Sequence, residues 1–482
     1  MDSQGVWEKT FDFFAEKPIV VEPVDAHLST DAGLLPIRQL DEALGMTGQF
    51  AAALIDDRTG PALTHTYLEM TRMRVYGILA GYEDQNDHDA LRSDAVFKLL
   101  AGRSPEDNDL ASQPTLSRFE NAIGPKSLFQ LRDVFIEQFI ASFEEPPSHL
   151  TLDIDTFDDA THGQQQLTFF HGYYDQYQYL PRVITCAEND QVVMAALLFG
   201  TASPTLGAAD DLEYLVGRLR AVWPGVRITI RADSGFAVPR FYEACERLGL
   251  HYTIGLKINA VLRRNSDALM AEAVAGFEQT GQPQRVFDAF WYRAGSWPAA
   301  RWVVVKAEAN AQGTNRRVVV TNRPGAFVLP EATYDEYADR GESENRNKEL
   351  KCSLSADRLS DHRFMANYFR LYLHSLAANL LVRVRHIVAD PPTADPSGEL
   401  PTEALAGRDR RRWFNRRREH DPLGEGHAET WRMRLIKVAA QIVVSTRRVL
   451  VRLSGSWPFL HHYRAVCSAI HAACTSLSID SS

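Results

Sequence analysis

The spacing of apolar residues changes along the chain, and the changes mark regions of different secondary structure. Between about residues 36 and 123 apolar residues recur every three or four positions, as in LDEALGM, TYLEMTRMRVYGILAGY and DAVFKLLAG. This interval is typical of amphipathic helices. Residues 1–35 are mixed and rich in turn-forming residues. We therefore predict an N-terminal helical domain at residues 1–145.

A strand pattern begins at residue 149. The segment HLTLDIDTF alternates apolar and polar residues, which predicts a β-strand with one buried face and places Asp153 and Asp155 on the other face. The runs that follow predict two strands, a helix, a strand ending at Asp233, a helix and a strand: LPRVITCAE, QVVMAALLFG, DLEYLVGRLRAVW, RITIRAD, RFYEACERLGL and HYTIGLK. This order is that of an α/β, ribonuclease H-like core, whose first part we assign to residues 146–258.

The pattern changes again after this core. Residues 259–333 contain short strand-like runs rich in aromatic residues, RVFDAFWYRAG, RWVVVKAEA and RRVVVTN, which predict a β-rich insertion. The core resumes at residues 334–388 with a long apolar helix, DHRFMANYFRLYLHSLAANLLVRVRH. Residues 389–482 hold a Pro-rich linker, an arginine-rich stretch and the strand-like RRVLVRL.

The stretch YADRGESENRNKELK stands out at the start of the second core part. On one helix, Tyr337, Arg340, Glu344 and Lys351 would lie within about 60° of one another, with Lys348 beside them. Such a stripe is also what a solvated helix face with i,i+4 ion pairs would show. The two strand aspartates favour a functional interpretation, because this helix can bring a carboxylate to them.

Three carboxylates that converge from two strands and a helix provide the oxygen ligands that hard divalent cations prefer. We expect Asp155, Asp233 and Glu344 to hold two Mg²⁺ (or Mn²⁺) ions, an arrangement suited to phosphodiester cleavage. Other chemistries lack their motifs. Ser234 in RADSGF lacks the first glycine of GxSxG, and no phosphate-binding glycine loop follows a strand.

Composition adds a charge asymmetry. The 482-residue chain has a formal net charge of −10, but residues 406–455 carry thirteen Lys/Arg against five Asp/Glu. Seven arginines lie between residues 408 and 418, and we expect Arg410, Arg411 and Arg412 to bind DNA phosphates. Five cysteines without CxxC spacing predict neither disulfides nor a zinc site, and no apolar run is long enough for a membrane span.

These motifs resemble those of a known protein family. The Tyr337, Arg340, Glu344 and Lys351 spacing resembles the signature of DDE transposases of bacterial insertion sequences. The segments LDIDTF, HGYYDQYQYLP and RADSGF are similar to those of the thirteen-eighty family. The resemblance implies a cytoplasmic, nucleoid-associated transposase that binds the terminal inverted repeats of its own element in double-stranded DNA. It also implies a homodimer and cut-and-paste transposition into target DNA.

The residues within the site have separate predicted roles. Asp155, rather than Asp153, is predicted to be the first catalytic carboxylate, because it lies nearer the strand end and precedes a small hydroxyl residue as in the resembling transposases. Asp153 is expected to pair with Arg231 or Lys351. The stripe residues Tyr337, Arg340, Lys348 and Lys351 are expected to bind DNA, the arginine and lysines through phosphates. One tryptophan of the insertion, Trp291, Trp297 or Trp302, is predicted to stack on a displaced base, unless all three are core residues.

Two N-terminal segments have alternative interpretations. SQPTLSRFENAI at residues 112–123 predicts a helix that begins near Pro114 and presents Arg118 either to DNA, as in a helix-turn-helix, or to solvent. GYEDQNDHDALR at residues 81–92 is rich in acidic residues but does not fit a calcium loop. We expect it to form a capped junction between helices.

Two other functions fit parts of the sequence. One is a non-catalytic DNA-binding regulator descended from a transposase, which the intact carboxylates disfavour. The other is a ribonuclease H-like nuclease without strand transfer.

Overall fold

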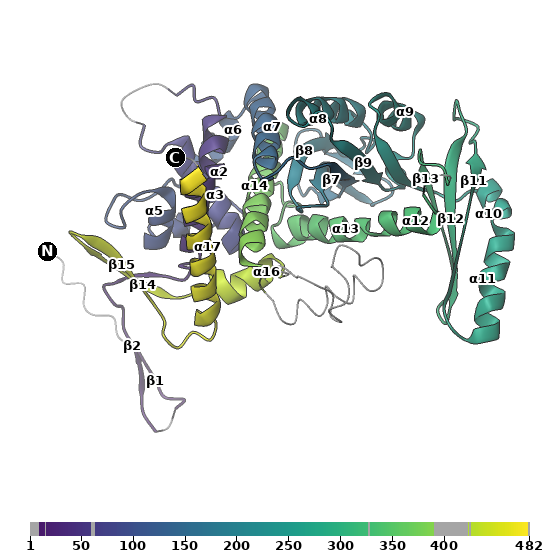
Figure 1. The fold of residues 1–482 in the computed structure, drawn as a ribbon. Helices are drawn as coiled ribbons and strands as arrows, with labels where there is room; N and C mark the ends of the chain where they lie inside the picture. Colours follow the sequence, from purple (N-terminus) through teal and green to yellow (C-terminus); the bar gives the residue numbers. More distant parts are fainter. Residues whose placement is uncertain are drawn as a thin grey trace.

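The computed structural model describes most of the chain, namely residues 9–14, 16–58, 63–325, 328–389, 423 and 426–480. The arginine-rich stretch at 408–418, with Arg410, Arg411 and Arg412, lies outside these residues. Figure 1 shows a helical body at one end, a sheet in the middle and a curved group of strands with two helices at the other end.

The predicted N-terminal helices are present. They are α1 (Leu34–Leu44), α2 (Met46–Ala52), α3 (Tyr67–Ala80), α4 (His88–Leu91), α5 (Ala95–Ala101), α6 (Gln113–Ala122) and α7 (Pro125–Ile140). A capping box between Thr66 and Glu69 begins α3, and Gly81, with φ of 89°, ends it. The acidic segment after Gly81 is a helix junction, as predicted, because α4 starts within it.

A ten-stranded mixed sheet forms the centre of the molecule. Its strands are β4 (His149–Thr156), β5 (Asp159–Ala160), β6 (Phe169–His171), β7 (Gln176–Cys186), β8 (Val192–Phe199), β9 (Arg227–Ala232), β10 (His251–Leu256), β11 (Gln284–Tyr292), β12 (Arg301–Asn310) and β13 (Gly313–Thr321). The main order is β11-β12-β13-β10-β9-β4-β7-β5, with β6 and β8 paired to β7. Strands β4, β9 and β10 are parallel, and the other pairs are antiparallel. The predicted α/β class is confirmed, and the sheet is mixed.

Strand β4 has two different faces, as its alternation predicts. Leu150, Leu152 and Ile154 pack in one core with α8 (Ala208–Val222) and α9 (Pro239–Arg247). The opposite face carries the aspartates and lies toward α12 (Pro330–Ala338) and α13 (Arg340–Lys348). Figure 1 shows these two helix pairs on opposite sides of the sheet. The apolar face therefore fixes which side of the sheet the aspartates face.

The insertion differs in part from the prediction. Its three strands are present, but two helices that the sequence reading missed precede them, α10 (Ala260–Asn265) and α11 (Asp267–Thr280). Helix α11 packs through Ala273 on Ala307 and Ala309 of β12, so small residues allow close contact. Because β13 pairs with β10, the insertion extends the central sheet.

The two ends of the chain share one hydrophobic core. The predicted long helix is α14 (Phe364–Val388), and the C-terminal elements are α16 (Ala428–Trp431), β14 (Ala440–Ser445), β15 (Arg448–Leu453) and α17 (Leu460–Asp480). Tyr76 and Phe97 of the N-terminal helices pack in one cluster with Phe369, Trp431 and Val466. Strand β3 (His27–Ser29) pairs with β14. The proposed division into five sequence ranges stays a prediction, but the first and last ranges are packed together.

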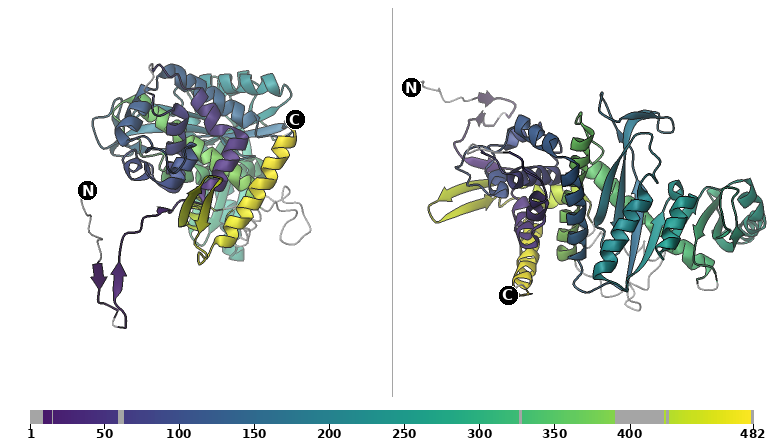
Figure 2. Two further views of the ribbon diagram at one scale, coloured as in Figure 1. Left: turned by 90° about the vertical axis from the view of Figure 1, so that its left-hand side faces the viewer. Right: turned by 90° about the horizontal axis from the view of Figure 1, so that it is seen from above.

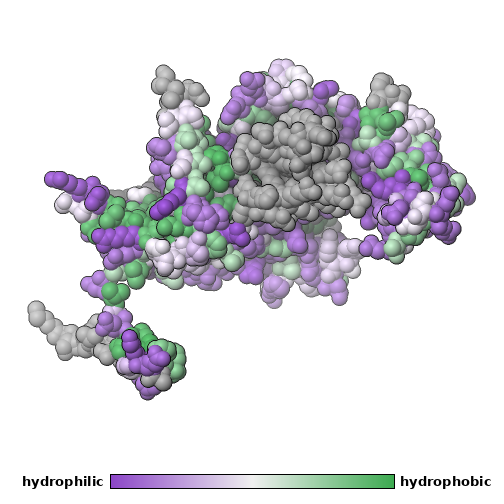
Figure 3. Space-filling model, turned by 60° about the horizontal axis from the view of Figure 1, so that its bottom comes forward, coloured by the Kyte–Doolittle hydropathy of each residue, from purple (hydrophilic) through white to green (hydrophobic). Residues whose placement is uncertain are grey.

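A short hairpin at the N-terminus extends away from this body. Strands β1 (Lys9–Phe11) and β2 (Ile19–Val21) pair with each other, and Figures 1 and 2 show them projecting from the helices. Figure 3 shows hydrophobic side chains on this projecting segment, where Phe13 and Phe14 are exposed. Within the described residues, no helix is both long and apolar enough to cross a bilayer.

Candidate active site

Asp155 and Asp233 lie at the carboxyl ends of adjacent parallel strands. The register pairs Ile154 of β4 with Ala232 of β9, so the next residue on each strand is an aspartate at the same sheet edge. Asp233 Oδ1 accepts the backbone N–H of Gly235 at 2.9 Å, which caps the turn after β9. Asp155 Oδ1 accepts the N–H of Thr156 at 2.9 Å. Sheet pairing thus brings two residues 78 positions apart together.

Arg340 connects this pair to Glu344. Its Nη1 donates to Asp155 Oδ2 at 3.2 Å, and its Nη2 donates to Glu344 Oε1 one helical turn away. Asn347 of the same helix also donates to Asp155 Oδ2, at 3.2 Å. Glu344 itself is exposed. Helix α13 therefore contacts Asp155 through Arg340 and Asn347, while the Glu344 carboxylate faces the guanidinium.

The site holds more negative than positive charge. Burial raises the pKa of Asp155 to about 6, opposed by the charge of Arg340 and reinforced by the charge of Asp233. A group of oxygen ligands with uncompensated charge suits a hard divalent cation. In the described part of the chain, no three acidic, His or Cys side chains lie close enough to form a metal cluster. The expected convergence of three carboxylates is thus seen for two of them, with Glu344 held by Arg340.

Asp153 has a different environment, although it shares a strand face with Asp155. Its carboxylate is buried and accepts two hydrogen bonds from Arg231, at 2.7 and 2.6 Å. The Arg231 Nη1 also donates to the backbone carbonyl of Glu336 in α12, at 2.8 Å. The predicted pairing of Asp153 with Arg231 is confirmed. Through this arginine, Asp153 positions the helix that carries Tyr337.

The signature stretch is not the single regular helix that we predicted. A break at Asp339 separates α12, with Tyr337, from α13, with Arg340, Glu344 and Lys348. Lys351 follows in a π-helical turn at Glu349–Ser353, where its Nζ lies 2.6 Å from Asp158 Oδ1. Ser343 of α13 forms a hydrogen bond with Thr185 of β7 at 3.0 Å. Tertiary contacts of this kind with the sheet set the path of the signature stretch. Lys348 is exposed.

A groove leads from the carboxylates toward the insertion. Its lining includes Asp233, Lys257, Arg316, Arg317 and Glu344. Arg316 is tied to Asp267 at 3.0 Å, whereas the Lys257 and Arg317 side chains are exposed. These cations border the acidic site on its insertion side.

Tyr337 forms part of the groove wall. A Cβ added to Gly255 of β10 would lie 2.5 Å from the Tyr337 hydroxyl, so only glycine leaves room for this ring. The Arg340 guanidinium lies 5.8 Å from the centre of the ring. Burial raises the pKa of Tyr337.

The sequence analysis did not predict three residues of the candidate site. Asn347 could have been found, because it lies three residues after Glu344 on the same helix face. Lys257 follows the end of β10. Its position at the same sheet edge as Asp233 could have been inferred from the parallel pairing of β10 with β9. Arg317 could not, since its place depends on the antiparallel pairing of β13 with β10.

The other predicted contact residues are spread over the molecule. Arg118 is exposed on α6, whereas Glu120 of the same helix is buried between Arg74 and Arg370. Among the insertion tryptophans, Trp297 is a core residue and Trp291 is 61% exposed. The Trp302 ring packs against Trp291, with 5.4 Å between ring centroids.

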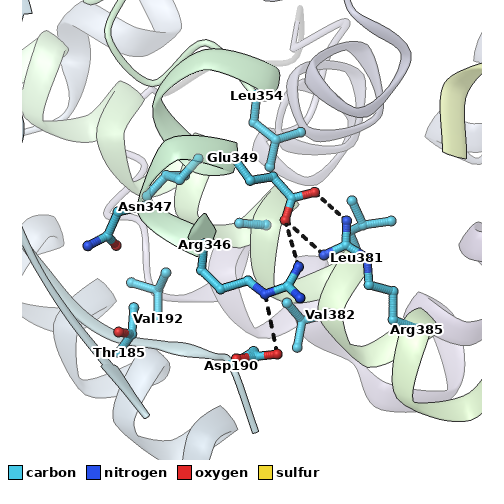
Figure 4. A pocket seen from close by; sticks show the side chains of 12 residues that line it. Thr185, Asp190, Val192, Arg346, Asn347, Glu349, Leu354, Leu381, Val382 and Arg385 are labelled. Atoms are coloured by element: carbon cyan, nitrogen blue, oxygen red, sulfur yellow. Dashed lines mark hydrogen bonds and ion pairs between the residues drawn. The ribbon is translucent and has the colours of Figure 1, made fainter. Parts of the chain in front are cut away.

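A buried ion cluster anchors the helix behind the site (Figure 4). Glu349 accepts hydrogen bonds from Arg385 at 2.9 Å, from Arg346 at 3.2 Å and from the backbone N–H of Ala428 at 2.6 Å. Arg346 also pairs with Asp190 at 3.3 Å. Burial opposes ionisation here, but Arg385 and Arg346 lower the pKa of Glu349 to about 2. The cluster joins the active-site helix to α14 and to the C-terminal segment.

A family model identifies the chain as a transposase. A family model described as transposase DDE domain group 1 matches residues 11–395. A solved structure, the cryo-EM structure of the piggyBac transposase synaptic complex with hairpin DNA, is similar at 13% sequence identity and a TM-score of 0.42. The match covers 82% of this chain and 81% of that chain. None of the curated proteins searched matches. Since the family model spans most of the chain, the protein belongs to the transposases with a DDE domain of group 1.

Proposed function

We propose that the protein is the transposase of a bacterial insertion sequence of the thirteen-eighty family. It binds the terminal inverted repeats of its element and moves the element by cutting and strand transfer. The observation that carries this proposal is the placement of Asp155 beside Asp233, with the Glu344-bearing helix attached to Asp155 through Arg340 and Asn347. The ribonuclease H-like description of the core and the homodimer belong to the same proposal.

The acidic residues would hold the divalent cations. Asp155, Asp233 and Glu344 are the proposed ligands of Mg²⁺ or Mn²⁺, two ions in the full site. When bound, such ions activate water or a 3′-hydroxyl and stabilise the departing oxygen in phosphodiester cleavage. The uncompensated charge around Asp155 supports this assignment.

The remaining residues would bind and orient the DNA. Arg340, whose fork can hold a phosphate, contacts Asp155, and Lys351 contacts Asp158. Lys257 and Arg317 extend the cationic surface along the groove, and Tyr337 forms its wall. Asn347 holds the Asp155 carboxylate in place, while Asp153 fixes α12 through Arg231.

More distant residues are proposed to bind the flanking duplex. Arg118 on α6 and exposed Lys348 on α13 contribute single positive charges. Arg410, Arg411 and Arg412 contribute phosphate contacts without base specificity. Neutralising these three arginines should flatten the salt dependence of DNA binding, by up to about 0.9 log unit per lost contact.

The test is a cleavage assay on DNA that carries the inverted repeats flanking the gene, with Mg²⁺ present. Asp155→Asn protein should give no detectable product, because it lacks a metal ligand. Asp153→Asn protein should keep part of the activity, because it loses only helix positioning. Both variants should still shift the DNA in a gel. The reverse order of activities would make Asp153 the catalytic residue, and cleavage without joining to target DNA would indicate a nuclease instead.

A further inference from the structure

An exposed aromatic hairpin lies at the end of the sheet near the candidate active site. It comprises β6, the start of β7 and the turn between them, residues 167–178. Six large apolar side chains in it are exposed: Leu167, Phe169, Phe170, Tyr173, Tyr174 and Tyr177. Tyr173 is 86% exposed, the largest value among the exposed large hydrophobic residues described. Exposed aromatic surface of this density marks a binding surface more often than a random feature.

The rings of this hairpin pack against one another and not into a core. Phe170 and Tyr177 are directly opposite across the strand pair, with ring centroids 5.6 Å apart. Tyr173 and Tyr174 in the turn are 5.0 Å apart. Phe169 contacts Phe199 of β8. The rings form an exposed aromatic cluster.

The backbone at the start of the hairpin and in its turn is in the left-handed conformation. Leu167 has φ of 60° and Asp175 has φ of 54°. Left-handed backbone is costly for a bulky residue such as leucine and persists only where the surroundings enforce it. Tyr179, one strand residue past the hairpin, enforces it in part, because its hydroxyl donates to the carbonyl of Gln166. The rings are therefore held in a fixed place.

The hairpin borders the catalytic carboxylates. Gln176 donates to Asp158 Oδ2 at 3.1 Å, and Asp158 pairs in turn with Lys351 of the signature stretch. Burial and the nearby charge of Asp158 raise the pKa of Tyr174. DNA with a phosphate at the carboxylates and another at Lys351 would continue onto the hairpin.

We propose that this hairpin is a stacking platform for unpaired bases at the end of the element. The proposal rests on the proposed function. Residues 167–178 contain Asp175 and no lysine or arginine, so the hairpin offers ring faces instead of phosphate contacts. Such faces bind bases in a sequence-tolerant way. A second copy of the chain bound at the hairpin would cover Asp158 and Lys351 beside the site. Because Lys351 is proposed to bind DNA, we favour DNA as the occupant.

The experiment compares two DNA probes: a blunt duplex, and the same duplex with a single-stranded tail that contains 2-aminopurine. All proteins carry Asp233→Asn to prevent cleavage. The parent protein should bind the tailed probe roughly tenfold more tightly per stacked base and quench the 2-aminopurine fluorescence. Tyr173→Ala and the double variant Phe170→Ala/Tyr177→Ala should lose both effects while binding the blunt duplex normally.

Phe129→Ala provides the matched control, because Phe129 is an aromatic residue on α7 that is 60% exposed. It should behave as the parent. If the hairpin variants keep the preference for the tail, the platform does not exist. If they instead become monomeric at unchanged preference, the hairpin is a contact between copies. Failure of the parent to bind either probe would contradict the proposed function itself.

Discussion

Glu344 and Glu349 are five residues apart in the signature stretch and belong to two different clusters of carboxylates. The two clusters are compensated by positive charge to different extents. Glu349 lies between two arginines and also accepts a backbone N–H, and its pKa is lowered to about 2. Asp155 and Asp233 have Arg340 as their nearby cation and share it with Glu344, and the pKa of Asp155 rises to about 6.

This difference separates a structural cluster from the proposed metal site. A carboxylate with an excess of donors is satisfied within the protein and fastens elements together. Carboxylates in excess over cations cost folding free energy, and they keep charge available for a bound ion. The following predictions change one cluster at a time.

The largest effect is expected from the acidic site. Asp233→Asn or Glu344→Gln should reduce DNA cleavage by about a thousandfold or more, equivalent to about 4 kcal/mol in activation free energy. Thermal unfolding should show a nearly unchanged Tm, because Asp233→Asn removes repulsion with Asp155 and Glu344→Gln loses only an exposed ion pair. A large loss of stability in either variant would place the residue in the structural class.

Glu349→Gln should have the converse effect. The free energy of unfolding should fall by about 3 to 4 kcal/mol, because Arg385 remains buried without its carboxylate. Urea unfolding measures this. Glu344→Gln is the matched control on the same stretch and should unfold as the wild type does. Equal midpoints for both variants would remove the distinction between the clusters.

The pH dependence of stability should differ in sign between the clusters. The lowered pKa of Glu349 means that its contribution is present above pH ~4.5 and is lost as pH falls toward 2. The raised pKa of Asp155 means that stability declines as pH rises from about 4 to 6. Each should amount to about 3 kcal/mol.

The comparison uses urea unfolding over pH in the presence of EDTA. Subtracting the Glu349→Gln curve from that of the wild type should leave a rise with pH, and subtracting the Asp155→Asn curve should leave a fall. Two differences of the same sign would mean that the acidic site is as fully compensated as the structural one.

The smallest effect concerns Arg340. In DNA-free protein, its guanidinium occupies the oxygens of Asp155 and Glu344 that a cation would use. Arg340→Gln should therefore tighten Mn²⁺ binding about tenfold, or ~1.4 kcal/mol, as measured by calorimetry. Arg317→Gln removes a charge from the same groove and should change the affinity much less. Equal changes in Mn²⁺ affinity for the two variants would mean that Arg340 acts only through its charge and not by occupying the carboxylate oxygens.

The sequence predicted the parts of the fold that depend on local patterns. Alternation in β4 predicted its buried apolar face and the place of Asp155 near the strand end, and the strand and helix order predicted the α/β class. The pairing of Asp153 with Arg231 followed from their places on adjacent strands. Local patterns also found α14, whose apolar run is long enough to be unambiguous.

The misses depend on tertiary contacts. The π-helical turn after Lys348 arises where Glu349 bonds Arg385 and Ala428, which are far away in the chain. Helix α11 was overlooked because aromatic and β-branched runs dominate the insertion. The sharing of Arg340 between two carboxylates is a matter of side-chain geometry that residue spacing does not encode.

The shared core of the two chain ends has a consequence for biosynthesis. The ribosome releases α1 to α7 first, but the cluster around Tyr76 also needs Trp431 and Val466. Asp31 likewise cannot form its ion pair with Lys437, at 2.6 Å, until Lys437 has been synthesised. Nascent chains therefore keep their N-terminal helices incompletely packed until translation ends. Chains that stop before Trp431 and Val466 should therefore be more susceptible to proteases than chains that include them.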